Sequence, residues 1–168
     1  VTLREAVVPP ANTNCEGAEL IELADGAGQA EGDTSFATDD HGPDSIADVF
    51  YRFSVAEDAS VSVTSIGNPS RETRILFLSG GCAEPEVVPV GSAADDLAPG
   101  ASRGSRGVLT PGDYLVVVTS PFIGEQGAFQ VSVELGEPIY PPDNDQCEGA
   151  IEIPGEGDQL VQGDTSNA

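Results

Sequence analysis

Short runs in which apolar and polar residues alternate recur along this 168-residue chain. The clearest run covers residues 128–135, where a strand would place every second side chain on one apolar face. The apolar members of this run are Phe129, Val131, Val133 and Leu135. Helical periodicity is nearly absent, and Gly, Pro, Asn and Asp separate the runs. This pattern is typical of an all-β sandwich.

The runs predict strands over 18–23, 33–37, 49–55, 59–66, 74–78, 86–90, 107–110, 113–120 and 128–135. Those over 49–55 and 113–120 carry apolar residues on both faces, so we expect them in the middle of a sheet that is covered on both sides. Residues 91–107 contain few large apolar groups and include the stretch Ser-Arg-Gly-Ser-Arg-Gly. They are predicted to form a long exposed loop without a function of its own.

A ten-residue phrase occurs twice in the chain. Pro9–Ala18 (PPANTNCEGA) returns as Pro141–Ala150 (PPDNDQCEGA), an interval of 141 − 9 = 132 residues, and weaker matches continue on either side. The chain is therefore predicted to be a window on a tandem array. In this interpretation residues 1–8 end a preceding repeat and its linker, 9–140 form one complete β-sandwich, and 141–168 begin the next repeat.

The connection between the units is short and rich in proline, which predicts a semi-rigid spacer. Its residues are Pro138, Ile139, Tyr140, Pro141 and Pro142. If Ile139 and Tyr140 also pack against a neighbouring unit, the array would be a stiff rod.

The charge of the chain is extreme: 29 acidic residues face six arginines, without a lysine, and the formal net charge is −23. Such a surface repels nucleic acid and anionic membranes, so neither is expected as a partner. No apolar run approaches the roughly 18 residues that a membrane span needs. Two interpretations of the acidity stay open, a solvated coat suited to secretion and a cluster of carboxylates that holds Ca²⁺.

Three cysteines are an odd number, which a secreted protein must explain. The repeat offers an explanation, because Cys147 stands where Cys15 stands one unit earlier. We predict a Cys15–Cys82 disulfide within the complete unit and a partner for Cys147 in the next repeat. Such a bond implies an oxidising compartment. The alternative is three buried or free thiols in a cytosolic protein.

Several motifs, in this order and spacing, resemble those of the bacterial pre-peptidase C-terminal domain family. They lie at Asn12–Ala18, Ala37–Asp40, Asp48–Phe53, Leu76–Cys82, Leu109–Val117 and Gly127–Val133. The resemblance spans nearly the whole unit, and it is strongest to the cysteine-containing variant of large secreted and surface proteins. It implies a jelly-roll-like antiparallel β-sandwich outside the cytoplasm, used as a non-catalytic appendage or as a repeated module.

The resemblance also implies a calcium site, because related collagen-binding modules hold Ca²⁺ between the N-terminal segment and an acidic loop. In this chain the corresponding residues are Asn12, Glu16, Asp39, Asp40, Asp44 and Asp48. Relatives often have Asn-Asp where this unit has Asn12-Thr13, which is one carboxylate fewer. The loop does not have the EF-hand spacing. Its other interpretation is a solvated turn whose aspartates cap backbone amides.

An enzyme is not expected. Nucleophilic hydrolysis needs a base beside the nucleophile, and the single histidine, His41, stands in the acidic loop without a Gly-x-Ser-x-Gly context. Sugar-cleaving clefts are rich in aromatic groups, but the chain has no Trp and three Tyr.

The preferred hypothesis is a structural repeat of a long extracellular filament or cell-surface adhesin, whose partners are neighbouring copies of itself. The alternative is an accessory domain of a secreted hydrolase that binds carbohydrate or a matrix protein.

Overall fold

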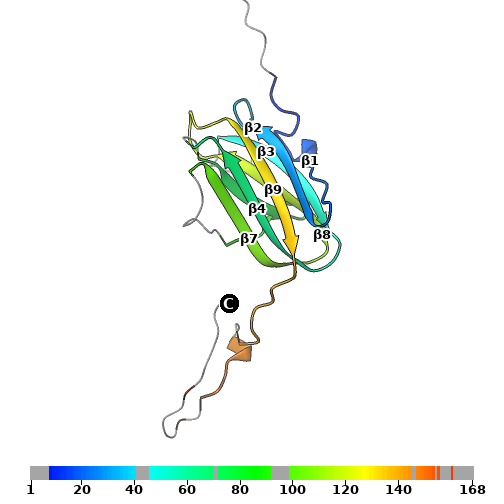
Figure 1. The fold of residues 1–168 in the computed structure, drawn as a ribbon, viewed down its shortest axis with the longest axis vertical. Helices are drawn as coiled ribbons and strands as arrows, with labels where there is room; N and C mark the ends of the chain where they lie inside the picture. Colours follow the sequence, from blue (N-terminus) through cyan, green and yellow to red (C-terminus); the bar gives the residue numbers. More distant parts are fainter. Residues whose placement is uncertain are drawn as a thin grey trace, which may run out of the picture.

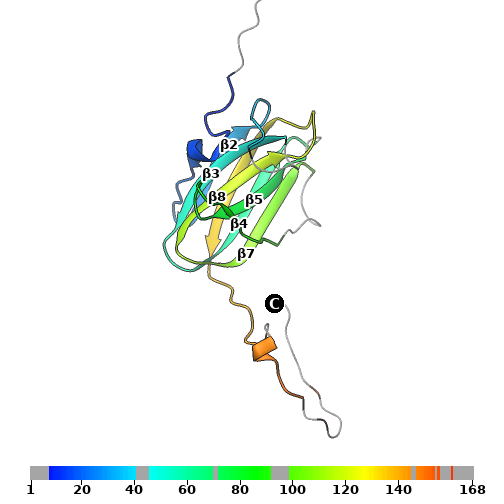
Figure 2. The ribbon, with the colours of Figure 1, turned by 180° about the vertical axis from the view of Figure 1, so that it is seen from behind.

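Two β-sheets face each other in this computed structural model, which describes residues 8–40, 46–69, 72–91, 99–144, 147–153, 155 and 160. The first sheet holds, in spatial order, β1 (Glu19–Leu20), β3 (Ala47–Val55), β8 (Gly112–Ser120), β5 (Arg74–Ser79) and β6 (Glu86–Val87). The second holds β2 (Ala27–Asp33), β9 (Ala128–Gly136), β4 (Ala59–Gly67) and β7 (Ala101–Leu109). Figure 1 shows the second sheet in front and Figure 2 shows the molecule from behind.

The predicted β-sandwich is confirmed. From β1 to β9 the chain changes sheet at every step except the one from β5 to β6. All pairings between the strands are antiparallel apart from that of β1 with β3, which is parallel. Two short 3-10 turns, η1 (Cys15–Gly17) and η2 (Cys147–Gly149), complete the described elements. Among the described residues, no helix has the length and apolar character needed to cross a membrane.

The main core lies between the two sheets. Alternate residues of β3, β4, β8 and β9 point into it, as the period of two in a strand requires. Its most deeply buried members include Val49, Tyr51, Phe53, Val63, Phe77, Val116, Val118, Val131 and Val133. The Tyr51 hydroxyl donates a hydrogen bond to the Glu31 carbonyl at 3.1 Å, and burial raises the pKa of this phenol. The core therefore satisfies the buried hydroxyl of its largest polar side chain.

The central strands are the two predicted from their apolar faces. β3 lies between β1 and β8, and β8 lies between β3 and β5. The second apolar face of these strands carries Phe50, Leu115 and Val117, all at most 5% exposed. Both sides of the five-stranded sheet are therefore covered, as expected.

The strand predicted over 33–37 is wrong: the strand β2 ends at Asp33 and the chain turns after it. The residues that do form β2 have the sequence AGQAEGD, which is poor in the β-branched and aromatic residues of ordinary strands. Gly28 and Gly32 lie on its inner face, where an added Cβ would meet Ile21 Cγ2 at 2.6 Å and Phe129 Cζ at 2.5 Å respectively. Glycine in this strand marks close approach of neighbouring groups.

The long loop predicted over 91–107 is also wrong in its second half, because residues 101–109 form strand β7. β7 pairs along β4, and its outer edge is bonded to Gly91, whose N–H and carbonyl both pair with Ser105. An added Cβ on Gly104 would meet Val90 Cγ2 at 3.2 Å. Pairing with β4, which the local sequence does not encode, makes this polar segment a strand. The predicted strands over 18–23 and 86–90 are each reduced to two residues.

The chain enters and leaves the sandwich at opposite ends of its long axis. Figure 1 shows the N-terminal segment at the top and β9 pointing down into the linker at the bottom, and Figure 2 agrees. The turn η2 lies below the sandwich, beyond the linker. The division of the chain into repeats stays a prediction.

The close approach at Gly32 can be tested by substitution. Gly32→Ala is expected to lower the free energy of unfolding by about 1–3 kcal/mol, because the new methyl group collides with the Tyr51 hydroxyl and the Phe129 ring. Gln29→Ala, on the exposed face of the same strand, is the control and is expected to stay within about 0.5 kcal/mol. Urea denaturation of both variants measures the difference, and equal stabilities would contradict the packing described for Gly32.

Candidate functional site

The N-terminal segment runs along the edge of β3, where it includes β1, and its middle lies against the outer face of the five-stranded sheet. We call residues 11–21 the lid. Asn12 holds its first end to the middle of β3: its carbonyl accepts from Phe50 N at 2.8 Å, and its Nδ2 donates to Phe50 O at 3.1 Å. At the other end, Ile21 N donates to Arg52 O at 2.9 Å, and the Ile21 side chain, 2% exposed, enters the main core. The lid is therefore bonded to β3 at both ends.

A tight turn shapes the middle of the lid. The Asn14 side-chain oxygen accepts from Gly17 N at 2.9 Å, and Ala18 N donates to Cys15 O at 3.0 Å, which closes η1. A side chain on Gly17 would collide with the carbonyl oxygen of Ala11. Asn is a favoured cap because its short side chain reaches the free N–H groups of the first turn. The sequence Asn14-Cys15-Glu16-Gly17 thus favours this turn locally.

Under the lid lies a second apolar cluster. Its four buried members come from β3, β5 and β8: Phe50, Leu78, Leu115 and Val117. Cys15 and Ala18 of the lid pack against them. Removing such side chains from water stabilises a fold by roughly 1.5–3 kcal/mol each. The lid therefore buries a sheet face that would otherwise be exposed to solvent.

A disulfide joins the lid to the far side of this cluster. Cys15 and Cys82 are bonded, with their Cα atoms 5.5 Å apart and a sequence separation of 67. Cys82 follows Gly80 and Gly81, whose φ angles of +85° and +73° suit glycine and form the turn after β5. Cys147, the third cysteine, is an exposed free thiol. The bonded pair is the one expected from the repeat.

The residues assigned to calcium by resemblance have mainly structural roles where they are described. Asp48 is fully buried in β3, and its Oδ2 accepts from Asp40 N at 3.0 Å. The Asp40 carboxylate in turn accepts from the hydroxyl of Thr38. Asn12 is committed to the backbone of Phe50. These contacts correspond to the alternative interpretation of the loop, in which aspartates cap backbone amides.

The remaining members of that set do not complete a cation site among the described residues. Glu16 is exposed, and together with Asp40 it lines a shallow pocket beside the disulfide. Asp39 is exposed, and Asp44 lies outside the described residues, as does His41. Within the described part of the chain, no three His, Cys, Asp or Glu side chains gather as metal ligands. The described residues by themselves therefore do not supply the six to eight oxygen ligands that a calcium ion takes, and the calcium site stays a prediction.

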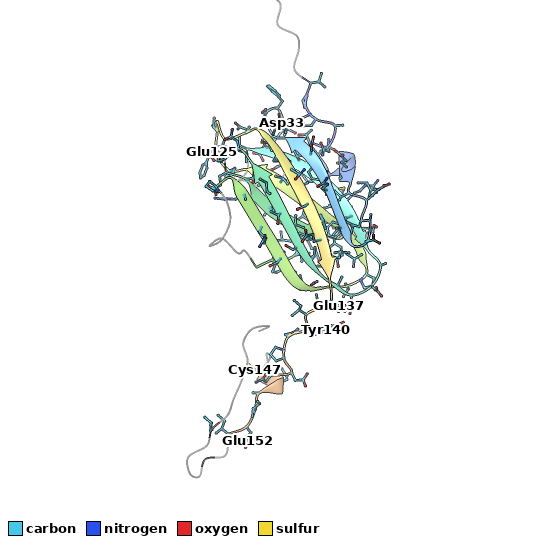
Figure 3. The ribbon with its side chains drawn as sticks, in the orientation of Figure 1. Asp33, Glu125, Glu137, Tyr140, Cys147 and Glu152 are labelled. Atoms are coloured by element: carbon cyan, nitrogen blue, oxygen red, sulfur yellow. A yellow bond between two sulfur atoms is a disulfide. The ribbon has the colours of Figure 1, made fainter. Side chains whose placement is uncertain are left out.

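The linker is docked to the base of the sandwich. Ile139 N donates to Gly107 O at 2.8 Å, and an added Cβ on Gly107 would meet the Ile139 carbonyl oxygen at 2.6 Å. The Tyr140 hydroxyl donates to Asp58 Oδ2 at 2.9 Å, and this hydrogen bond raises the pKa of Tyr140. Figure 3 shows Glu137 and Tyr140 directly below the end of β9. These two hydrogen bonds hold the first half of the predicted linker against the lower end of the sandwich. The sequence alone did not identify this contact surface.

Sequence reasoning found the Cys15–Cys82 pair and the linker but missed the surfaces on which the lid and the linker lie. The sequence indicated the second apolar cluster only through strands that are apolar on both faces. It did not indicate that residues 11–18 would cover this cluster. Gly107 and Asp58, the partners of the linker, also carried no signal. Gly107 follows Arg106 in a segment predicted as a loop, and nothing in that sequence indicates that Ile139 binds there.

No family model matches the chain, and no curated protein matches it. Among solved structures, the pre-peptidase C-terminal domain of a collagenase from Bacillus anthracis is similar, with 14% sequence identity and a TM-score of 0.46. The match covers 70% of this chain and 94% of that one. This likeness is weak. The β-sandwich described above is defined by the strand pairing of this chain itself.

The disulfide is expected to be a main source of stability for the lid. Replacing both Cys15 and Cys82 with Ala should lower the free energy of unfolding by roughly 4 kcal/mol, the chain-entropy value for a loop of this length. Cys147→Ala is the matched control and should leave stability unchanged, because that thiol is exposed and unbonded. Chemical denaturation under non-reducing conditions gives both values. A double variant as stable as the control would rule out a stabilising crosslink.

Proposed function

We propose that the chain is a structural repeat of a long extracellular filament or cell-surface adhesin-like array, and that it has no catalytic role. Neighbouring copies of the same unit are its partners. Residues 9–140 form the complete repeat, residues 1–8 end the preceding one, and residues 141–168 begin the next. The role of each unit is to extend the array and to present an acidic, protease-resistant surface.

The observation that carries this proposal is a comparison of the lid with its second copy. In the second copy, Ala150 N donates to Cys147 O at 3.3 Å and a side chain on Gly149 would collide with the Asp143 carbonyl, which is the turn seen at Gly17. However, Ile153 is 59% exposed, whereas its equivalent Ile21 is 2% exposed. The second copy thus has the local structure of a lid but no sheet to cover. A following unit in the array would supply that sheet.

The geometry of the ends also supports an extended array. The chain enters at one end of the long axis and leaves at the other (Figure 1). Successive units would then follow one another in line and not side by side. The docked linker and its prolines restrict bending at the exit, because Ile139 and Tyr140 are both bonded to the unit they leave. A Cys15–Cys82 bond in each unit suits an oxidising medium outside the cell.

The array predicts a native polypeptide far heavier than the 17.2 kDa of this sequence. Mass measurement of the native protein after reduction and denaturation checks this, because reduction separates any chains that are joined only by disulfides. Peptides that repeat the phrase PPxNxxCEGA at intervals of about 132 residues should be found in its digest. A native mass near that of this sequence would contradict the array.

Calcium binding stays a prediction from the resemblance, and it has its own test. An ion that binds only the folded state adds RT ln(1 + [L]/Kd) of stability, so Ca²⁺ should raise the melting temperature of EDTA-treated protein. Asp40→Asn should abolish the rise, whereas Glu134→Gln, on the exposed face of β9, should not. A melting temperature that does not respond to Ca²⁺ or EDTA would contradict calcium binding.

A further inference from the structure

The lid and its second copy agree at the positions where the lid touches the sandwich. Six lid positions from 11 to 21 are not exposed, and five of them hold the same residue 132 positions later. The five identical pairs are Asn12 and Asn144, Cys15 and Cys147, Gly17 and Gly149, Ala18 and Ala150, and Ile21 and Ile153. The sixth pair is Thr13 and Asp145.

The exposed lid positions behave differently. Of Ala11, Asn14, Glu16, Glu19 and Leu20, only Glu16 has an identical counterpart, Glu148. Identity is therefore concentrated on the surface that meets β3 and the second apolar cluster. A segment that matches at its contact positions has the chemistry to bind the same sheet face.

This second copy is presented to solvent. We call the described residues Pro141–Asn144 and Cys147–Ile153 the tail. Asn144, Cys147, Ala150 and Ile153 are all exposed, and the Cys147 thiol is free. Figure 3 shows Cys147 and Glu152 well below the sandwich, past the end at which the linker leaves. The tail is thus held away from the sheet face of its own chain.

We propose that the outer face of the five-stranded sheet is a docking surface for the tail of another copy, with Cys147 replacing Cys15 as the partner of Cys82. Asn144 would bond to the backbone of Phe50, Ala150 would cover the apolar cluster, and Ile153 would enter the main core where Ile21 lies. Copies would then join end to end by exchanging one lid for another. The proposal rests on the proposed modular role, because at a unit whose tail is not covered by a following unit it gives a second chain a way to continue the array.

The covalent step is a thiol–disulfide exchange and needs no external oxidant. The Cys147 thiolate of one copy attacks Sγ of Cys82 in another, the Cys147–Cys82 bond forms and the Cys15–Cys82 bond breaks. Cys15 leaves as a thiolate and takes up the proton that Cys147 lost. The number of disulfides is unchanged. The direction of the exchange is therefore decided by whether the tail or the lid binds the sheet face more tightly through noncovalent contacts.

The docking is tested with Cys15→Ala in the full 168-residue chain, which leaves Cys82 free while its own lid can no longer be bonded. In a glutathione redox buffer, oxidised glutathione accepts the two electrons released when two thiols join. We expect a ladder of crosslinked copies on a non-reducing gel, collapsed by reductant, with the Cys82–Cys147 link identified by mass mapping. Cys15→Ala combined with Cys147→Ala should remain monomeric.

A matched pair of substitutions distinguishes docking from chance collision of thiols. In the Cys15→Ala background, Ile153→Asp should slow crosslinking roughly tenfold or more, because it would bury an unpaired charge at the place of Ile21. Ile151→Asp should have little effect, because it corresponds to the exposed Glu19. Equal rates for the two variants would overturn the proposal. So would Cys82–Cys82 or Cys147–Cys147 dimers as main products, or a Cys82–Cys147 link within a monomer.

If Cys15→Ala no longer melts cooperatively, a second measurement answers the same question. The Cys147→Ala chain, with its lid disulfide intact, is incubated in the redox buffer with a synthetic peptide of residues 141–153. Attachment of the peptide at Cys82 supports the docking surface, while attachment at Cys15 or no attachment overturns it. These results are independent of the native mass, so loss of this proposal and loss of the array can be told apart.

Discussion

The structure depends on a sheet that is apolar on both faces. The outward side chains of β3, β5 and β8 include Phe50, Leu78 and Val117, which would be exposed if nothing lay across them. An exposed apolar patch on a protein surface favours association. The lid covers it, and the bonds of Asn12 to Phe50 and of Cys15 to Cys82 hold the lid there. These few contacts explain what the phrase at residues 9–18 does in the fold: it places the residues that cover and crosslink this face.

The same constraint bears on the proposed array. A unit that begins with its lid and ends with a docked linker has its two attachment points at opposite ends of the long axis (Figure 1). The turn at Cys-Glu-Gly forms in both copies because it is local, with glycine at the crowded position. Its burial, by contrast, requires a sheet assembled from residues far away in sequence. The second turn has its local structure although its side chains are not buried, and such a segment is suited to bind a following unit of the proposed array.

The high negative charge is compatible with this architecture because most acidic groups lie on the wet surface. Asp48 is an exception: it is fully buried, and its carboxylate accepts from the backbone N–H of Asp40. Repulsion among the surface carboxylates opposes the compact state. The crosslinked lid and two apolar clusters act against it. Two of the described arginines, Arg103 and Arg106, lie on β7, where Arg106 donates to the carbonyls of Pro89 and Val108.

The sequence by itself determined the fold class, the central strands, the cysteine pair and the recurrence of the ten-residue phrase, because alternation, two-sided apolar runs and recurrence at a fixed interval are local or one-dimensional signals. Only the tertiary structure decided that 27–33 and 101–109 are strands, since their small and polar residues form ladders only when β9 and β4 lie beside them. It also decided where the acidic residues act: Asp40 and Asp48 are linked through a backbone amide that no spacing rule predicts. The physical reason is the same in each case, because contacts between segments distant in sequence depend on which surfaces remain to be covered after the sheets have formed.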